Sequence, residues 1–330
     1  MKTVVYTCPY VPAEWIAAHG LCPRRSLLDS VDSGVSRSRR EGVCPYVRSF
    51  IGEVTENSEA DAVVMTTVCD QMRRAFDVIA RNCALPAFLM NVPSMWQTLA
   101  SQKLYVDELK RLSRFLVERG GKAPSNNMLA EIMIQYDEVR TSIRASREYL
   151  SARRFAEAIA ENRVCNEPAL SVSNGLRTLH DREGIPLAIV GGPLMKADFD
   201  LLDMIEQLGG RVVLDASETG ERGMCPKFDR GRLADDPLLE LAHAYFGGIP
   251  DASRRPDGEL YRWLKCELTG REVRGIVFRR YVWCDLWHAE LARLKEWCGL
   301  PVLDLDAAGE NGADLPRTST RVRAFLEMLQ

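Results

Sequence analysis

No two of the ten cysteines in this 330-residue chain stand at C-x-x-C spacing. Zinc ribbons and ferredoxin-type clusters rely on that spacing, so the sequence excludes both as local motifs. The chain also lacks the patterns G-x-G-x-x-G, G-x-x-x-x-G-K-[ST], H-E-x-x-H and G-x-S-x-G. These absences leave little support for nucleotide binding, a zinc protease site or a serine hydrolase site.

Long apolar runs and an excess of basic residues are missing as well. No run reaches the roughly 18–20 apolar residues of a membrane helix, so we expect no membrane span. The net charge is −3, whereas nucleic-acid-binding domains usually carry a basic excess, so we expect no nucleic-acid partner. Residues 1–10 start like a short strand rather than a signal peptide. We therefore expect a cytoplasmic protein with reduced cysteines.

Short apolar, β-branched runs alternate with helix-like segments at both ends of the chain. Residues 60–68 and 85–91 read as strands on either side of a helical run over residues 70–82. Because these runs are continuous rather than alternating, they predict a parallel sheet that is covered on both faces. The later strand-like runs cover residues 185–190, 211–215, 273–278 and 301–305.

The pattern predicts an α/β fold of two Rossmann- or flavodoxin-like parallel-sheet lobes joined by a helical segment. The first lobe is expected at residues 1–95, the helical linker at 96–179 and the second lobe at 180–330. The linker is rich in Leu, Glu, Lys, Arg and Ala, with apolar residues at helical spacing. A final helix is expected over residues 320–329, and Ser125 is expected to cap a long linker helix.

Three cysteines stand in related local contexts. Cys69 and Cys284 each close a strand-like run and are followed by Asp, and Cys44 lies in the segment G-V-C-P-Y-V-R. A residue at the carboxyl end of a strand points into the crevice where open α/β sheets bind ligands. Three thiolates converging there suit a 4Fe–4S cluster with one iron left open. Buried inert thiols are the alternative, and we apply that interpretation to the other seven cysteines.

Several other residues are candidates for a site near these cysteines. Gly191 and Gly192 form a turn after a strand, where amides can hold a phosphate or carbonyl oxygen, although a structural turn explains them too. Ser217 and Glu218 belong to a polar loop after the next strand, which is either a substrate wall or a solvated loop. His288 follows the third cysteine by one helical turn, and a structural or surface role is its alternative.

The chain resembles the 2-hydroxyacyl-CoA dehydratase family, which also contains the benzoyl-CoA reductase subunits. The resemblance is carried by several motifs in the same order, and it extends over nearly the whole chain. The opening is similar to the family's P-E-x-I-x-A-A-G, and the ending to its t-R-x-x-a-F-x-E. The matching segments are residues 10–20, 42–49, 69–74, 85–93, 281–287 and 320–327.

The resemblance implies two flavodoxin-like lobes that hold a 4Fe–4S cluster on three cysteines, here Cys44, Cys69 and Cys284. It also implies that two related subunits pair, and that an ATP-dependent iron–sulfur activator protein supplies single electrons. In the family's dehydratases, one electron converts the thioester carbonyl of an acyl-CoA into a ketyl radical, which expels the hydroxyl group. The substrate here would be an acyl-CoA or a related small molecule.

Three charged residues next to these cysteines are expected to surround the cluster. Asp70 and Asp285 directly follow a cysteine, and Arg73 lies one helical turn further on. Arg73 would offset the negative charge of a thiolate-bound cluster and so raise its reduction potential. Gly191 and Gly192 complete the expected cofactor-binding residues, while Ser217, Glu218 and His288 are the catalytic candidates.

The chain departs from the family in two loops that would lie beside the substrate. Family members often have a cysteine in the loop matching residues 215–222 and a Cys-Pro in the stretch matching residues 245–250, and both are absent here. We therefore expect an iron–sulfur subunit of a dehydratase-like or acyl-CoA reductase-like system. The alternatives are a non-catalytic electron relay or assembly partner, or a reductase of a non-CoA substrate. Pairing with a homologous subunit and pairing with itself both stay open.

Overall fold

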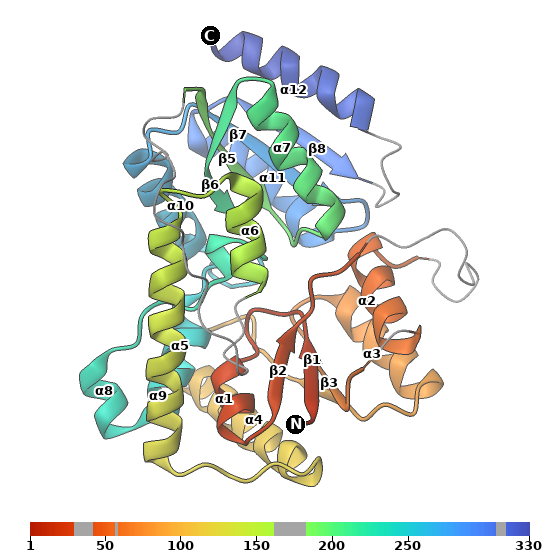
Figure 1. Ribbon diagram of the computed structural model, residues 1–330, viewed down its shortest axis with the longest axis vertical. Coiled ribbons are helices and arrows are strands. Elements are labelled where there is room, and N and C mark those ends of the chain that lie inside the picture. Colours follow the sequence, from red (N-terminus) through yellow and green to blue (C-terminus); the bar gives the residue numbers. More distant parts are fainter. Residues whose placement is uncertain (30–41, 57–58, 162–182, 308–314) are drawn as a thin grey trace.

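The computed structural model describes residues 1–29, 42–56, 59–161, 183–307 and 315–330, and within them it has two parallel sheets, one in each lobe (Figure 1). The first sheet has the strand order β2-β1-β3-β4. Its strands are β1 (Thr3–Tyr6), β2 (Cys22–Arg25), β3 (Ala62–Thr66) and β4 (Ala87–Met90). The strands predicted at 60–68 and 85–91 are confirmed. The sequence analysis missed β2, a polar edge strand that contains a proline.

The second sheet repeats this arrangement with the strand order β6-β5-β7-β8. Its strands are β5 (Ile185–Gly191), β6 (Gly210–Ala216), β7 (Gly275–Tyr281) and β8 (Val302–Ala307). In both sheets the first two strands in the chain lie side by side, and the third pairs on the other side of the first. The predicted α/β fold in two parallel-sheet lobes is confirmed. In such a sheet, a crevice forms at the carboxyl ends of the strands, between the first strand and the two strands that follow it on opposite sides.

Helices cover the sheets and connect the lobes (Figure 1). The helices before β5 are α1 (Ala13–Ala18), α2 (Pro45–Glu56), α3 (Asp70–Asn82), α4 (Leu99–Glu118), α5 (Asn126–Ser146) and α6 (Ala152–Ala160). Those after β5 are α7 (Phe199–Gln207), α8 (Arg230–Asp235), α9 (Pro237–Ala242), α10 (Gly258–Gly270), α11 (Asp285–Cys298) and α12 (Leu315–Leu329), with short 3-10 turns at Lys196–Asp198 and Glu221–Gly223 and a π turn at His243–Gly247. No helix among the described ranges is both long and apolar enough to span a membrane.

The helical linker begins with α4 and α5, and both are capped as polar residues predict. Thr98 Oγ1 accepts the backbone N–H of Ser101 at 3.1 Å, and Ser125 Oγ accepts that of Met128 at 3.2 Å. The expected cap at Ser125 is therefore present. Helix α5 runs alongside the first lobe in Figure 1, and its upper end reaches the second lobe.

A segment that follows β6 returns to the core of the first lobe. Phe228, Leu241 and Phe246 join the apolar cluster that contains Tyr105 of α4. The rings of Tyr105 and Phe246 stack with centroids 4.7 Å apart. We call residues 224–250 the returning segment. The domain limits at 95 and 179 stay a prediction, but the first core also uses the returning segment from the second half of the chain.

Candidate functional site

A cavity of about 350 Å³ lies between the lobes, where the carboxyl ends of the two sheets face each other. It is lined from the first lobe by residues that follow β1, β3 and β4, and from the second lobe by residues that follow β5, β6 and β7. Parallel sheets place their ligand sites at this edge. The carboxyl edges of both sheets therefore line the same cavity.

Cys44, Cys69 and Cys284 all line this cavity. Each stands directly before a helix: Cys44 before α2, Cys69 before α3 and Cys284 before α11. Cys69 and Cys284 are also equivalent in topology, because each follows the third strand of its sheet. The amino ends of three helices thus meet at the cavity, and a helix amino end favours negative charge. Thiolates are the negative form of these residues.

Burial opposes that negative charge. It raises the pKa of Cys44 to about 11 and that of Cys284 to about 12, and it raises the pKa of Cys69 further. The backbone amide three residues after each cysteine lowers the thiol pKa, although at Cys69 and Cys284 the contact falls short of a capping hydrogen bond. Without a bound cation the three thiols therefore keep their protons at neutral pH, and metal binding would release them.

The donor set suits a cluster better than a single ion. Among the described residues, no three His, Cys, Asp or Glu side chains are placed so that they could hold one metal ion. In a 4Fe–4S cluster each thiolate binds a different iron, so the ligands stand further apart around the core. One buried cysteine and two half-buried ones around one cavity match this arrangement in type and number. When bound, a cluster supplies one-electron transfer at the site.

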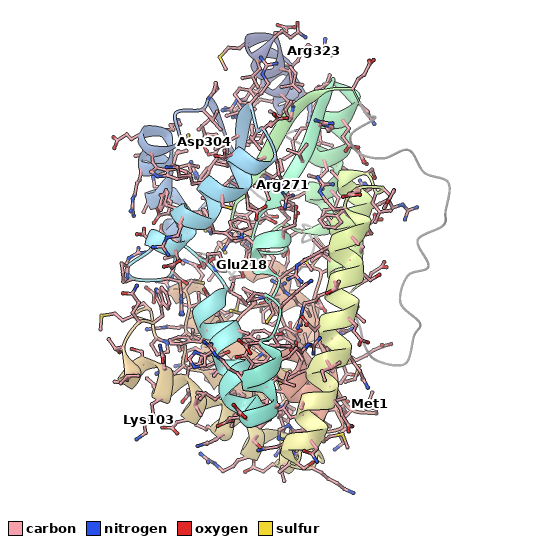
Figure 2. The ribbon with its side chains drawn as sticks, turned by 90° about the vertical axis from the view of Figure 1, so that its left-hand side faces the viewer. Met1, Lys103, Glu218, Arg271, Asp304 and Arg323 are labelled. Carbon is pink, nitrogen blue, oxygen red and sulfur yellow. The ribbon has the colours of Figure 1, made fainter. Side chains whose placement is uncertain are left out.

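Glu218 is one of the catalytic candidates, and it lines the cavity from the end of β6. Figure 2 shows it near the middle of the molecule, between the lobes. Burial raises the pKa of its carboxyl group to about 7, and the nearby charge of Asp251 adds to the shift. The cations of Arg222 and Arg25 lower the pKa in part. The group is therefore poised to exchange a proton near neutral pH.

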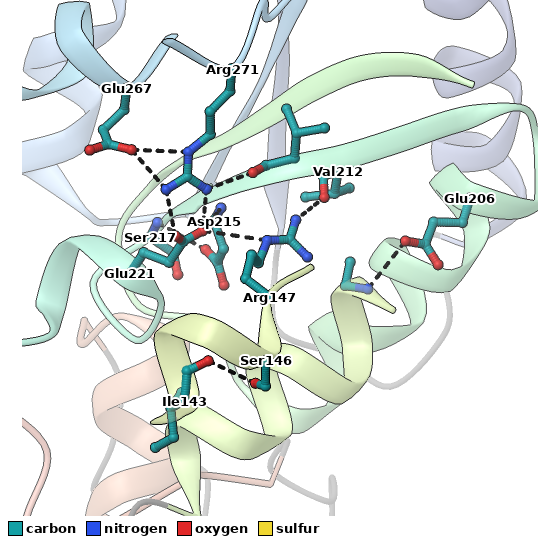
Figure 3. Close-up of polar contacts among 12 residues, drawn as sticks. Ile143, Ser146, Arg147, Glu206, Val212, Asp215, Ser217, Glu221, Glu267 and Arg271 are labelled. Carbon is teal, nitrogen blue, oxygen red and sulfur yellow. Dashed lines mark hydrogen bonds and ion pairs between the residues drawn. The ribbon is translucent and has the colours of Figure 1, made fainter. Parts of the chain in front are cut away.

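Ser217 and His288 are not brought to the cavity wall. Ser217 is fully buried, and its hydroxyl accepts the backbone N–H of Gly220 at 3.0 Å, so it shapes the turn. His288 is exposed on α11. Figure 3 shows that Arg271 supports the same loop. Its Nη1 and Nη2 donate to the two carboxylate oxygens of Glu221 at 3.0 and 2.7 Å. This support fixes the loop that carries Glu218.

The two turn glycines have different surroundings. Gly191 has φ +154°, and a Cβ there would lie 1.9 Å from the carbonyl oxygen of Arg279, so its place in the turn is structural. A Cβ on Gly192 would lie 3.2 Å from Trp287 and 3.8 Å from Sγ of Cys284. Gly192 therefore keeps the chain close to one of the three thiols.

The charged residues next to the cysteines lie at the cavity mouth. Asp70, Arg73 and Asp285 are exposed and line it. Nη1 of Arg73 stands 3.8 Å from Oδ1 of Asp70, a distance typical of a weak surface pair. These three residues, which the sequence analysis expected to surround a cluster, therefore form an exposed polar rim of the cavity rather than a buried shell.

Three residues of the site were missed by the sequence analysis. Cys8 is buried, lines the same cavity and has its pKa raised by burial to about 12. Arg222 is fully buried, pairs with Asp251 and stands 4.7 Å above the ring of Trp287. Cys8 follows the first strand of the chain, so its position after a strand was the available signal. Nothing in the local sequence marks Arg222 or Asp251 as buried partners.

Comparisons with known proteins identify the family of this chain. The sequence profile of the family described as "2-hydroxyglutaryl-CoA dehydratase, D-component" matches residues 8–329. The chain belongs to this family. A curated relative is the "Putative dehydratase subunit YjiM" of Escherichia coli (strain K12), which is 23% identical over an alignment of 367 residues. The alignment covers 98% of this chain and 90% of the relative. The D-component family model therefore covers nearly the whole chain.

A solved structure gives a much weaker match. It is described as the SBP FpvC in complex with a Ni²⁺ ion from P. aeruginosa, and the match covers 100% of this chain and 97% of that chain at 11% identity. Its TM-score is 0.26, which carries no argument about fold or function. The D-component assignment therefore rests on the sequence profile.

Proposed function

We propose that this chain is the iron–sulfur subunit of a 2-hydroxyacyl-CoA dehydratase-like or acyl-CoA reductase-like system. In this proposal Cys44, Cys69 and Cys284 hold one 4Fe–4S cluster. The observation that carries it is the meeting of these three thiols, each at the start of a helix, around one cavity between two sheets. Membership of the D-component family supports the same reaction class.

The chain's own residues give the cavity a polar and an apolar side. Thr66, Thr67 and Asn91 line it from the first lobe, with Trp287 opposite them. Such a wall suits a small molecule that has a carbonyl group and an apolar body. The exposed rim of Asp70, Arg73 and Asp285 is open to a larger, charged part of the substrate.

The proposal includes partners. One chain supplies one set of three cysteines, so we propose pairing with a homologous subunit or with a second copy, and an ATP-dependent iron–sulfur activator that supplies electrons. Trp283, beside the third cysteine, is 65% exposed at the mouth of the cavity and has φ +67°. A strained, exposed aromatic at a site is a candidate contact for such a protein. We also propose a cytoplasmic location without nucleic-acid or membrane partners.

An electron relay is the second candidate function, and one observation favours it. Ligand pockets usually have volumes of about 300–1,000 Å³. The cavity, at about 350 Å³, has to hold the cluster as well as any substrate. Little room then remains beside the open iron, and a subunit that only transfers electrons needs none.

Anaerobic purification, followed by iron and sulfide analysis and an EPR spectrum of the reduced protein, tests the cluster. We expect about four irons and four sulfides per chain. An assay with activator, ATP, reductant, the partner subunit and a panel of 2-hydroxyacyl-CoA and aromatic-CoA thioesters tests the reaction. A cluster without dehydration or reduction of any thioester would select the relay, and a protein that binds no iron would contradict both functions.

A further inference from the structure

Cys44 is held in place differently from the other two cysteines of the proposed cluster. Cys69 follows β3 and Cys284 follows β7, so the two sheets place them, and the N–H of Cys284 donates to the carbonyl oxygen of Tyr281 at the end of β7. Cys44 follows no strand in the part of the chain that the structure describes. Its position therefore depends on contacts with a neighbouring element.

Helix α3 provides the first of these contacts. The backbone N–H of Cys44 donates to Oε1 of Gln71 at 3.0 Å. Gln71 lies in the first turn of α3, two residues after Cys69, and it lines the cavity. Because only the oxygen of a carboxamide can accept this bond, the bond also sets the orientation of the side chain. It joins the backbone at one cysteine to the helix that begins directly after another.

This bond replaces a contact that many helices make within themselves. In a capping box, a Glu or Gln at the third helical position accepts the N–H of the residue before the helix. In α2 the third position is Val47, whose side chain has no acceptor. Gln71 supplies the acceptor from the neighbouring helix instead, so the start of α2 is fixed to α3.

Two further contacts hold the same two segments together. Nη1 of Arg74 donates to the carbonyl oxygen of Gly42 at 3.2 Å, and Gly42 has φ +80°, a turn conformation that glycine adopts without strain. Cys44 and Met72 also belong to one buried apolar cluster. The protein's own contacts thus fix the start of α2, with Cys44, against the start of α3, with Cys69.

We propose that Gln71 is the positioning residue of the first lobe, and that its bond to Cys44 sets the separation of the Cys44 and Cys69 thiols that a cluster needs. This inference rests on the proposed function. Gln71 binds no iron in this scheme, because it acts through the backbone of Cys44. Removing a group that orients a metal ligand typically changes metal affinity about 10–100-fold, so one lost bond should loosen the cluster.

Hydrogen exchange in the metal-free, reduced protein measures the bond itself. Cysteine labelled at its backbone nitrogen gives one signal per cysteine, and Cys44→Ser assigns the signal of interest. We expect this N–H to exchange at least about tenfold faster in Gln71→Leu than in the wild type, because leucine leaves the donor without an acceptor. Gln71→Glu supplies a carboxylate oxygen and should keep the slow exchange. Gln135→Leu, the same change at an exposed glutamine of α5, is the matched control.

Anaerobic reconstitution of the same proteins with iron and sulfide measures the consequence for the cluster. Gln71→Leu should lose iron about tenfold faster than the wild type on mild oxidation, and the EPR line shape of its reduced cluster should change. Gln71→Glu should restore the slow loss of iron, because it restores the acceptor. Gln135→Leu should match the wild type in both measurements.

Each result decides one step of the proposal. Equal exchange at Cys44 in the wild type and Gln71→Leu would overturn the bond, and faster exchange with unchanged iron loss would overturn its role at the cluster. Failure of Gln71→Glu to restore slow exchange and slow iron loss would overturn the proposal too. A wild type that takes up no iron or sulfide would refute the proposed function, and the role of Gln71 with it. The exchange experiment needs no metal, so it distinguishes that failure from the absence of the bond.

Discussion

The two lobes share one strand order but contribute different chemistry. Each sheet places a Cys-Asp pair after its third strand, at the start of a helix, so Cys69 and Cys284 occupy equivalent positions. The first lobe adds Cys44 and Cys8, while the second adds the acid Glu218. Both lobes therefore contribute a thiol to the cavity, and they differ in that the first adds two further thiols and the second adds a carboxyl group. The cavity is complete only when both lobes are present.

The lobes also differ in how they are closed. The first core includes the returning segment, so part of the second half of the chain packs against α4 and α5. The second core keeps its own C-terminal helix, because Phe325 and Leu329 pack on the sheet where Gly275 leaves them room. The first lobe therefore depends on the second, and their relative placement is held by a shared core rather than by a loose hinge.

The largest expected effect comes from removing the cysteine of either Cys-Asp pair. Either Cys69→Ala or Cys284→Ala should abolish the cluster, because two protein thiolates hold a cubane too weakly. Iron analysis and EPR after anaerobic reconstitution measure this. Cys298→Ala, at the other end of α11, is the matched control and should keep its iron. Loss of iron in only one of the two variants would refute a cluster that is held by both lobes.

The next effect tests the shared core. Phe246→Ala should lower the free energy of unfolding by about 3–5 kcal/mol, since the ring is almost fully buried and leaves a cavity beside Tyr105. Urea titration measures the loss, and hydrogen exchange should rise in α4 and β1. Met328→Ala, at a side chain that is 62% exposed, should change stability by less than about 0.5 kcal/mol. Faster exchange confined to the second sheet would contradict the shared core.

The acid of the second lobe predicts a pH dependence in the metal-free protein. The pKa of Glu218 is raised from 4.5 to about 7, so its contribution to stability is present below pH 4.5 and is lost as the pH rises towards 7. The loss amounts to at most about 3 kcal/mol, from about 1.4 kcal/mol per pKa unit, because Glu218 is only half-buried and solvent screens part of the effect. Glu218→Gln does not titrate, so urea titrations from pH 4.5 to 7.5 should show its advantage growing with pH. Parallel curves for the two proteins would contradict the raised pKa of Glu218.

The smallest effect concerns the turn after β5. Gly192→Ala places a methyl group 3.2 Å from Trp287, which should cost about 1 kcal/mol and slightly change the EPR spectrum through Cys284. Gly191→Ala should cost far more, because its Cβ would lie 1.9 Å from a carbonyl oxygen at φ +154°. Thermal unfolding distinguishes the two. Equal losses would mean that the turn is not held as described.

Local pattern predicted the elements better than it predicted their partners. Helix α3 begins and ends where the run over residues 70–82 indicated, because a strand and a helical period follow each other in one short stretch. The edge strand β2 escaped because it is short and polar. The returning segment also escaped, since an amphipathic helix does not encode which core it joins. Glu218 was a candidate from its loop, but its burial depends on residues far away in the chain.

Diffraction at the iron absorption edge, from crystals of the anaerobically reconstituted protein, tests the central claim most directly. The claim is that cysteines of both lobes hold one cluster. We predict a single iron peak in the cavity, in contact with Sγ of Cys44, Cys69 and Cys284. Iron bound to cysteines of one lobe only, or at any place outside this cavity, would contradict the account.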